Sequence, residues 1–201
     1  MSYVCHMSVK RTHAQELMTM KITDISAAIP GCRVYPGDPM PSVTKLSDAE
    51  KDGYSLSAIS LCSHSGTHVD APSHFISGGY GADGIPLYKC VGECLVTDDV
   101  DAALAAARRQ TRIILKGCDI NAEQARSLAE NKIDLIGTDA LSFGETYDEQ
   151  ADVHKTLLGA GIVLLEGLCL SDADCGSYTL VALPLKLKDC DGSPVRAVLL
   201  S

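Results

Sequence analysis

Several features that would place this chain in a common class are missing from its sequence. No stretch approaches the roughly 18 consecutive apolar residues that a membrane-spanning helix needs. Lys and Arg number 17 against 26 Asp and Glu, and they form no basic run, so nucleic acid is not expected as a partner. The first twenty residues lack the apolar stretch of a secretory signal, and we expect a cytoplasmic protein.

Motifs of several well-known sites are also missing. None of the nine cysteines forms a Cys-x-x-Cys pair, which argues against structural zinc and thioredoxin-like chemistry, so we expect reduced thiols. The segment "GYGADG" (79–84) matches G-x-G-x-x-G, but no strand–turn–helix surrounds it, and we interpret it as a flexible loop. A phosphate-binding loop and a G-x-S-x-G nucleophile elbow are absent, and no spacing favours a Cys–His nucleophile pair.

The 201 residues suit a single α/β domain. Partial alternation predicts strands at 21–29 and 54–63, on either side of the turn-rich segment 35–41. Strands at 92–99, 112–117, 134–139 and 162–168 are then expected to alternate with helices at 101–109, 121–131 and 151–161, and β segments at 178–187 and 194–201 close the chain. We therefore predict one domain over 21–201 with mixed strand directions, preceded by an N-terminal extension (1–20) that need not be ordered.

The segment "HSGTHVDAPSH" (64–74) holds three of the six histidines and an aspartate within eleven residues. A helix is excluded there, because Gly66 weakens it and Pro72 would end it. The zinc-protease motif is excluded as well, because it needs Glu directly after the first His, where Ser65 stands. The segment is therefore expected to be extended.

In an extended chain the even-numbered residues share one face, and these are His64, His68, Asp70 and His74. A straight strand would separate the Cα atoms of His64 and His68 by about 13 Å, which two ligands of one ion can barely span. We expect a bend at Gly66, where the backbone has the freedom for it. Pro72 keeps Ala71 extended, which directs His74 toward the same place.

Two later residues can complete such a site. Glu166 ends the apolar run "GIVLLE", and a buried carboxylate is costly unless it is paired, hydrogen-bonded or bound to a metal. His154 lies on the expected helix that leads into this strand. Together with the first cluster, these residues offer enough N and O ligands for two divalent ions, with a carboxylate available to bridge them. A metal-binding module without catalysis is the alternative.

The segment "HSGTHVDAPSHF" resembles the His-x-Gly-Thr-His-x-Asp-Ala-Pro-x-His signature of the cyclase family, which includes bacterial kynurenine formamidase and isatin hydrolase. The resemblance continues in "YPGDP", "LIGTDALS", "HKTLLGAGIVLLEGL" and "LPLKLKDCDGSPVRAV". It implies a swivelling β/β/α domain with a mixed sheet, assembled as a homodimer or homotetramer. It also implies metal-assisted hydrolysis of an amide C–N bond in a small molecule. Arylformamidase activity, from N-formylkynurenine to kynurenine and formate, is favoured, and hydrolysis of a cyclic amide or lactone, as by isatin hydrolase, is the alternative.

The same resemblance implies the metal ligands. The first ion would be held by His64, His68 and Asp70, and the second by Asp70, His154 and Glu166. Two divalent ions are thus expected, zinc as in formamidases or manganese as in isatin hydrolase-like members. A divalent ion lowers the pKa of bound water and polarises a carbonyl.

Two further positions concern proton transfer and substrate. His74 is implied as the catalytic acid/base, a role that suits an imidazole near neutral pH. Tyr35 stands where kynurenine formamidases tend to carry a Trp that lines the substrate pocket, so it is implied as a substrate-binding residue. The linker 118–120 is short, whereas family members usually have a longer, aromatic-bearing loop there. Both departures affect the substrate pocket and leave the metal ligands in place.

Overall fold

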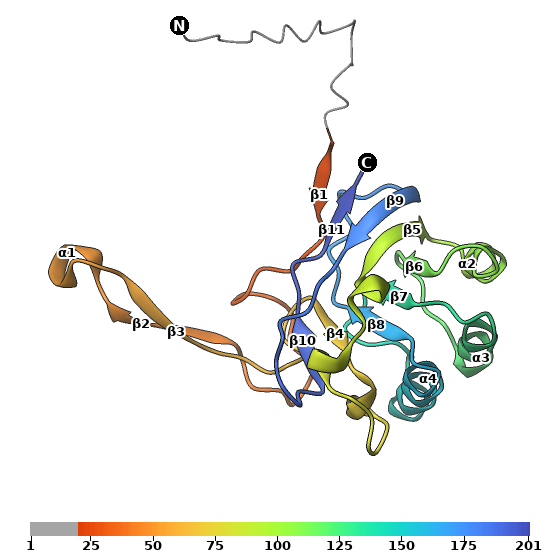
Figure 1. The fold of residues 1–201 in the computed structure, drawn as a ribbon, viewed down its shortest axis with the longest axis horizontal. Helices are drawn as coiled ribbons and strands as arrows, with labels where there is room; N and C mark the ends of the chain where they lie inside the picture. Colours follow the sequence, from red (N-terminus) through yellow and green to blue (C-terminus); the bar gives the residue numbers. More distant parts are fainter. Residues whose placement is uncertain (1–19) are drawn as a thin grey trace, which may run out of the picture.

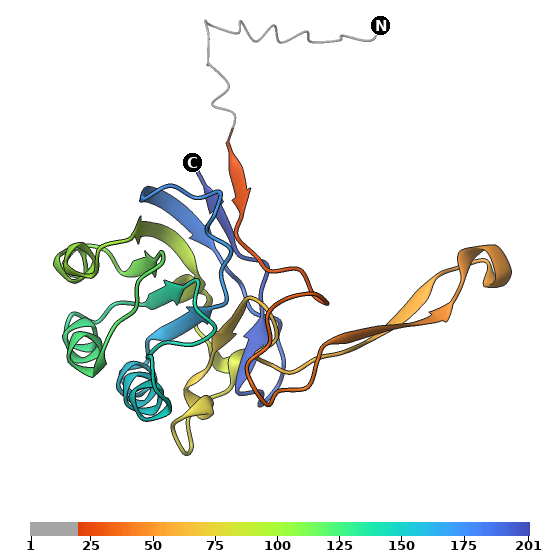
Figure 2. The same ribbon diagram turned by 180° about the vertical axis from the view of Figure 1, so that it is seen from behind.

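The computed structural model describes residues 20–201, so nearly all of the expected N-terminal extension (1–20) lies outside the described residues. The described chain forms a curled nine-stranded sheet with helices α2, α3 and α4 along one face, and a separate two-stranded hairpin projects away from this body (Figure 1). The view from behind shows the same separation of hairpin and body (Figure 2).

The elements alternate along the chain much as the sequence pattern predicts. The strands are β1 (Ile22–Asp24), β2 (Ser42–Ser47), β3 (Leu56–Ser60), β4 (His68–Asp70), β5 (Val91–Thr97), β6 (Arg112–Leu115), β7 (Leu135–Thr138), β8 (Val163–Glu166), β9 (Gly176–Val181), β10 (Gly192–Pro194) and β11 (Val198–Leu200). The α-helices are α1 (Ala49–Asp52), α2 (Val100–Ala106), α3 (Ala122–Glu130) and α4 (Tyr147–Gly159), and the 3₁₀ turns are η1 (Pro72–His74), η2 (Ala82–Gly84) and η3 (Leu87–Cys90).

The large sheet is mixed, which confirms the expected fold class. Its strand order is β1-β11-β9-β5-β6-β7-β8-β4-β10. Strands β5 to β8 run parallel, and each crossover between them is made by a helix, as parallel pairing requires. The remaining strands pair antiparallel at the two ends of this parallel centre.

The parallel strands β6, β7 and β8 are buried on both faces, which explains their nearly continuous apolar sequence. In β6, Ile113 and Leu115 belong to the core beneath the helices, whereas Ile114 belongs to the core on the other face. In β8, Leu164 faces the helices and Leu165 faces the opposite core. The sheet therefore separates two hydrophobic layers and fixes the ends of its strands firmly in space.

Local sequence signals hold in part. The helix expected at 121–131 begins with a capping box, because Asn121 caps α3 and the Gln124 side chain accepts from the Asn121 N–H. Helix α4 begins earlier than predicted, at Tyr147, since the Thr146 hydroxyl accepts the Glu149 N–H and caps it there. Strands β2 and β10 were not predicted, β4 lies in the segment 64–74 that was expected to be extended, and 3₁₀ turn η2 lies in the expected loop 79–84.

Two expectations concern the chain as a whole. The cysteines in the described residues are all free, and Cys90 and Cys94 are buried. Within residues 20–201, no helix has the length and apolar character needed to cross a membrane.

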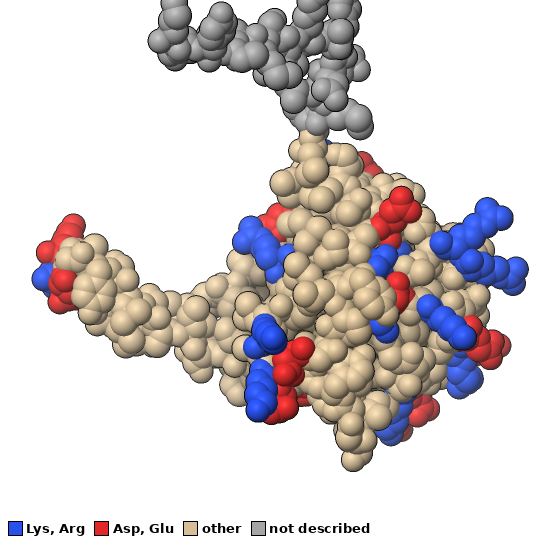
Figure 3. All heavy atoms as spheres, viewed as in Figure 1, with Lys and Arg blue, Asp and Glu red and all other residues tan. Residues whose placement is uncertain are grey.

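The hairpin formed by β2, α1 and β3, residues 42–60, is called the arm. Val43 lies opposite Ile59 in its register, and both side chains are exposed. Charged side chains cluster at the tip of the arm, while its shaft is almost free of them (Figure 3). An isolated two-stranded hairpin is only marginally stable in water. The arm would therefore be stabilised by packing its exposed apolar side chains against another surface.

Candidate metal centre

Strand pairing brings the predicted ligands to one place. Strand β4 lies between β8 and β10, with His68 directly opposite Glu166. His68 and Asp70 are two residues apart in this strand, so their side chains leave the same face. His154 reaches this face from α4, and its Nε2 lies 3.2 Å from Glu166 Oε1.

The expected bend occurs at Gly66. Its φ is +67°, a left-handed conformation that favours glycine, and a Cβ there would lie 2.9 Å from the Ile29 side chain. The bend turns the chain back, so that His64 Nδ1 lies 2.9 Å from Asp70 Oδ1. Ala71 is extended as predicted, but His74 then lies in 3₁₀ turn η1 rather than in a continuing strand.

Two buried carboxylates form the centre of the cluster. Asp70 is fully buried and Glu166 is 3% exposed. His68 Nε2 lies 3.4 Å from Asp70 Oδ1 and 3.5 Å from Glu166 Oε2. The second oxygen of Asp70, Oδ2, is buried without a hydrogen-bond partner, which costs free energy unless another group completes its shell.

The rings of His68 and His154 are held from outside the cluster. His68 Nδ1 donates to the Gly66 carbonyl at 2.9 Å, and His154 Nδ1 donates to the Gln150 carbonyl at 2.7 Å. Each ring therefore presents Nε2 to the two carboxylates. This is the arrangement of metal-binding histidines, whose outer N–H is usually fixed by an acceptor.

The charges of the cluster reinforce one another in the metal-free protein. Burial alone would lower the pKa of His68 and of His154, but the neighbouring carboxylates of Asp70 and Glu166 raise both to about 10. Burial alone would raise the pKa of Asp70, but the surrounding histidines hold it well below its ordinary value. Protons thus occupy the nitrogen atoms that a metal ion would need, and metal binding must displace them.

A cavity of about 290 Å³ opens onto the cluster and contains the other two predicted residues. His74 stands beside His64, with ring centroids 4.1 Å apart, and burial lowers its pKa. Tyr35 lies at the cavity wall, where its hydroxyl donates to Gln150 Oε1 at 2.7 Å. All seven residues singled out in the sequence therefore line or adjoin one cavity.

The chain was compared with known proteins. Residues 18–116 match the family model described as Putative cyclase. The kynurenine formamidase of Salinibacter ruber (strain DSM 13855 / M31) is 34% identical over 207 aligned residues, which cover 90% of this chain and 97% of that protein. The chain belongs to the cyclase family. A kynurenine formamidase of Erythrobacter litoralis (strain HTCC2594) is 33% identical, with 89% of this chain and 93% of that protein covered.

Solved structures of the cyclase family have the same fold. A protein from Bacillus stearothermophilus, described as a "predicted metal-dependent hydrolase", is 32% identical with a TM-score of 0.75, covering 90% of this chain and 98% of that one. Isatin hydrolase A from Labrenzia aggregata has a TM-score of 0.74 over 90% of this chain and 93% of that one. Its identity is 24%, so this likeness concerns the fold.

Sequence reasoning missed residues that this cyclase-family chain brings to the cluster from elsewhere. Asp191 Oδ2 lies 3.1 Å from His64 Nε2 and 3.4 Å from His74 Nδ1. The Phe143 N–H donates to Glu166 Oε1 at 3.0 Å and fixes that carboxylate. Asp191 falls within the family-like segment "LPLKLKDCDGSPVRAV", but nothing in its local pattern tells that it faces a histidine.

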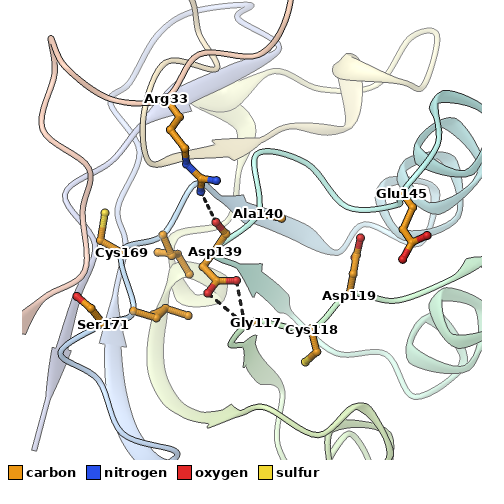
Figure 4. Close-up of a pocket in the computed structure, with 11 residues that line it drawn as sticks. Arg33, Gly117, Cys118, Asp119, Asp139, Ala140, Glu145, Cys169 and Ser171 are labelled. Carbon is orange, nitrogen blue, oxygen red and sulfur yellow. Dashed lines mark hydrogen bonds between the residues drawn. The ribbon is translucent and has the colours of Figure 1, made fainter.

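A larger hollow, of about 730 Å³, lies near the carboxyl ends of β6 and β7 (Figure 4). Arg33 donates to the Asp139 carbonyl there, and the Asp139 carboxylate accepts the Gly117 N–H. None of the seven predicted site residues lines this hollow. Cys118 and Asp119, from the short linker 118–120, line it instead of the histidine cavity.

Proposed function

We propose that this cyclase-family member is a metal-dependent hydrolase of an amide C–N bond, of the arylformamidase type. Its substrate would be N-formylkynurenine, and its products kynurenine and formate. The observation that carries the proposal is the buried pair Asp70 and Glu166, surrounded by histidine nitrogens, with Asp70 Oδ2 left without a hydrogen bond. Two relatives that align over most of the chain are named kynurenine formamidase, which supports the substrate.

Two divalent ions fit the donor set. One set consists of His64, His68 and Asp70, and the other of Asp70, His154 and Glu166, and within each set the ligand atoms lie within 4.8 Å of one another. Zinc suits these N and O ligands best, and manganese is the alternative. A bound ion would polarise the substrate carbonyl and lower the pKa of a water molecule beside it.

The proton transfers fall to His74. Burial lowers its pKa, so its imidazole is neutral at pH 7 and can accept a proton. Water oxygen adds to the formyl carbon, and His74 takes the proton that the water loses. The C–N bond then breaks as His74 returns that proton to the leaving amine nitrogen, which releases formate and the free amine. Tyr35, at the wall of the same cavity, would contact the aryl ring.

A cyclic amide or lactone is the second candidate substrate. The observation in its favour is the cavity wall, because the linker 118–120 lines the larger hollow and contributes no side chain to the histidine cavity. Tyr35 also hydrogen-bonds Gln150, which holds its ring at one place. A small bicyclic substrate would need less aromatic contact than an extended arylformamide.

We further propose that the chain works as a homodimer or homotetramer in which the arm docks on a second copy. Exposed apolar side chains on the arm include Val43, Leu56 and Ile59, and the shaft between tip and body is almost uncharged (Figure 3). The arm is joined to the cavity at both of its ends, since Tyr35 precedes β2 and His64 follows β3. A partner holding the arm would therefore also steady the cavity. A cytoplasmic location stays a prediction.

The test of the hydrolase proposal compares metal-stripped and zinc-reloaded protein on a panel of arylformamides and cyclic amides. Zinc-dependent release of formate from N-formylkynurenine is the expected result. Zinc-dependent opening of a cyclic amide alone would favour the second candidate. Two bound ions without hydrolysis of any substrate would point to a metal-binding module and contradict the proposal.

A further inference from the structure

We propose that Asp191 is a positioning residue that orients His64 as a metal ligand and His74 as the acid/base. The inference rests on the proposed function of the cluster. It adds a residue outside the two ligand sets, which immediately precedes β10 at the edge of the sheet.

The backbone fixes where Asp191 stands. Strand β10, which begins at Gly192, pairs with β4 so that Gly192 lies opposite Asp70. The Asp191 carbonyl accepts the Ala71 N–H at 2.9 Å. Asp191 is thus bound to the same short segment that carries Asp70 and His74, and its side chain emerges beside the two rings.

The carboxylate of Asp191 divides its two oxygen atoms between different partners. Oδ1 accepts the Ser63 hydroxyl at 2.7 Å. Oδ2 lies 3.1 Å from His64 Nε2 and 3.4 Å from His74 Nδ1. Ser63 therefore sets the rotation of the carboxylate, and that rotation turns the other oxygen toward both rings.

His64 lies between two carboxylates, Asp70 on its Nδ1 side and Asp191 on its Nε2 side. A nitrogen that binds a metal must be deprotonated, so the ring proton has to reside on the other nitrogen. Asp191 supplies the acceptor for a proton on Nε2, which leaves Nδ1 free toward Asp70. His68 and His154 have backbone carbonyls in this role, and His64 alone among the three has a carboxylate.

The backbone beside Asp191 confirms how closely His64 fits. A Cβ at Gly192 would lie 2.7 Å from His64 Cε1 and 2.9 Å from the Val69 carbonyl oxygen. The ring therefore packs directly on the main chain of residue 192. Residues 191 and 192 together fix both the position of the ring and the direction of its nitrogen atoms.

His74 depends on Asp191 in a different way. Its ring contacts His64 and Phe75, and Asp191 is the carboxylate nearest to its Nδ1 in the described structure. Asp191 Oδ2 lies 3.4 Å from His74 Nδ1, a contact longer than its hydrogen bond to His64. A modest closure of this gap would let Asp191 accept the Nδ1 proton and leave Nε2 able to take a proton from the reaction, the role that an orienting carboxylate has for other catalytic histidines.

The experiment uses the full chain in four forms: wild type, Asp191→Ala, Asp191→Asn and Asp189→Asn. Asp189 is exposed and two residues away, so Asp189→Asn removes the same charge without touching either histidine. Zinc affinity is measured by calorimetric titration of metal-stripped protein, and kcat and KM are measured at saturating zinc.

Asp191→Ala is expected to bind zinc about 10–100-fold more weakly, the usual effect of removing the outer partner of a ligand histidine. Asp191→Asn keeps one acceptor oxygen and should lose less zinc affinity than Asp191→Ala. Asp189→Asn should bind zinc as tightly as the wild type. At saturating zinc, Asp191→Ala should lose kcat with little change in KM, because His74 acts in the chemical step. If Asp191→Ala does not fold, Ser63→Ala, which frees Oδ1 alone, should show the same two losses in milder form.

Wild-type zinc affinity in Asp191→Ala would overturn the role at His64, and wild-type kcat at saturating zinc would overturn the role at His74. Equal losses in Asp191→Asn and Asp189→Asn would also overturn the proposal, since charge alone would then explain them. A wild type that binds zinc but hydrolyses no amide would refute the proposed function, while the affinity comparison would still decide whether Asp191 orients His64.

Discussion

Replacing Asp70 with Asn should weaken metal binding more than any other single change in the cluster. Asp70 Oδ1 faces His64 and His68, while Oδ2 lies 3.5 Å from His154 Nε2, so one carboxylate serves both ligand sets. Two unit charges about 4 Å apart attract each other by about 4 kcal/mol at the effective dielectric constant of such sites, and a divalent ion attracts at least as strongly. That is about three powers of ten in Kd for each ion that Asp70 contacts. His154→Ala removes one ligand of one set and should spare the other ion.

The measurement is the metal content of each purified variant after dialysis against a zinc buffer, determined by mass spectrometry. The wild type should retain close to two ions per chain, His154→Ala about one, and Asp70→Asn few or none. Asp172→Asn, an exposed change of the same kind, controls for loss of charge. Wild-type metal content in Asp70→Asn, or a larger loss in His154→Ala, would refute the assignment of the shared carboxylate.

Three further expectations concern pH, substrate and assembly. The pKa values of His68 and His154 are raised to about 10 in the folded, metal-free protein, so the stability they contribute is fully present below about 6.5 and is lost as pH rises toward 10. The lowered pKa values of Asp70 and Glu166 add stability that is lost as pH falls below about 4. The Tm of stripped protein, followed by calorimetry, should therefore fall between pH 6.5 and 10, and a rise over that range would contradict the charge arrangement. Tyr35→Ala should raise KM for N-formylkynurenine in steady-state assays, because the lost aromatic contact is worth roughly 1–3 kcal/mol. An unchanged KM would show that Tyr35 does not contact the substrate. The double variant Val43→Asp, Ile59→Asp should be a monomer in light scattering. Lys51→Glu, at the tip of the arm, changes the net charge by the same amount and should leave the oligomer intact. A wild type that is itself monomeric would refute docking of the arm.

The sequence predicts the local geometry of the candidate metal centre well. His64, His68 and Asp70 lie within seven residues, and the position of Gly66 between them is enough to predict the bend that brings them together. Glu166 and His154 can be recognised because a carboxylate at the end of an apolar strand needs a partner. The parallel strands are equally clear, since burial on both faces leaves long apolar runs.

Most of the features that the sequence does not reveal depend on pairing between distant segments. Strands β4 and β10 are three residues long, and each exists because the other, or β8, pairs with it. The contact between Asp191 and His64 cannot be predicted from the sequence for the same reason, because it forms only when β10 lies beside β4. No residue of strand β2 is buried, so no buried face gives it a pattern to recognise.

The proposal that this chain is an enzyme, and not only a metal-binding protein, is tested most directly by His74→Ala measured beside the wild type. Both ligand sets are complete without His74, so the variant should keep its ions and its fold. A positioned base contributes about 10²–10⁴-fold to the rate, so kcat for the amide should fall by that factor while KM changes little. Metal content and kcat are measured on one preparation of each protein. Loss of an ion from His74→Ala would show that His74 is a ligand, and full activity with both ions bound would show that the proton moves by another route.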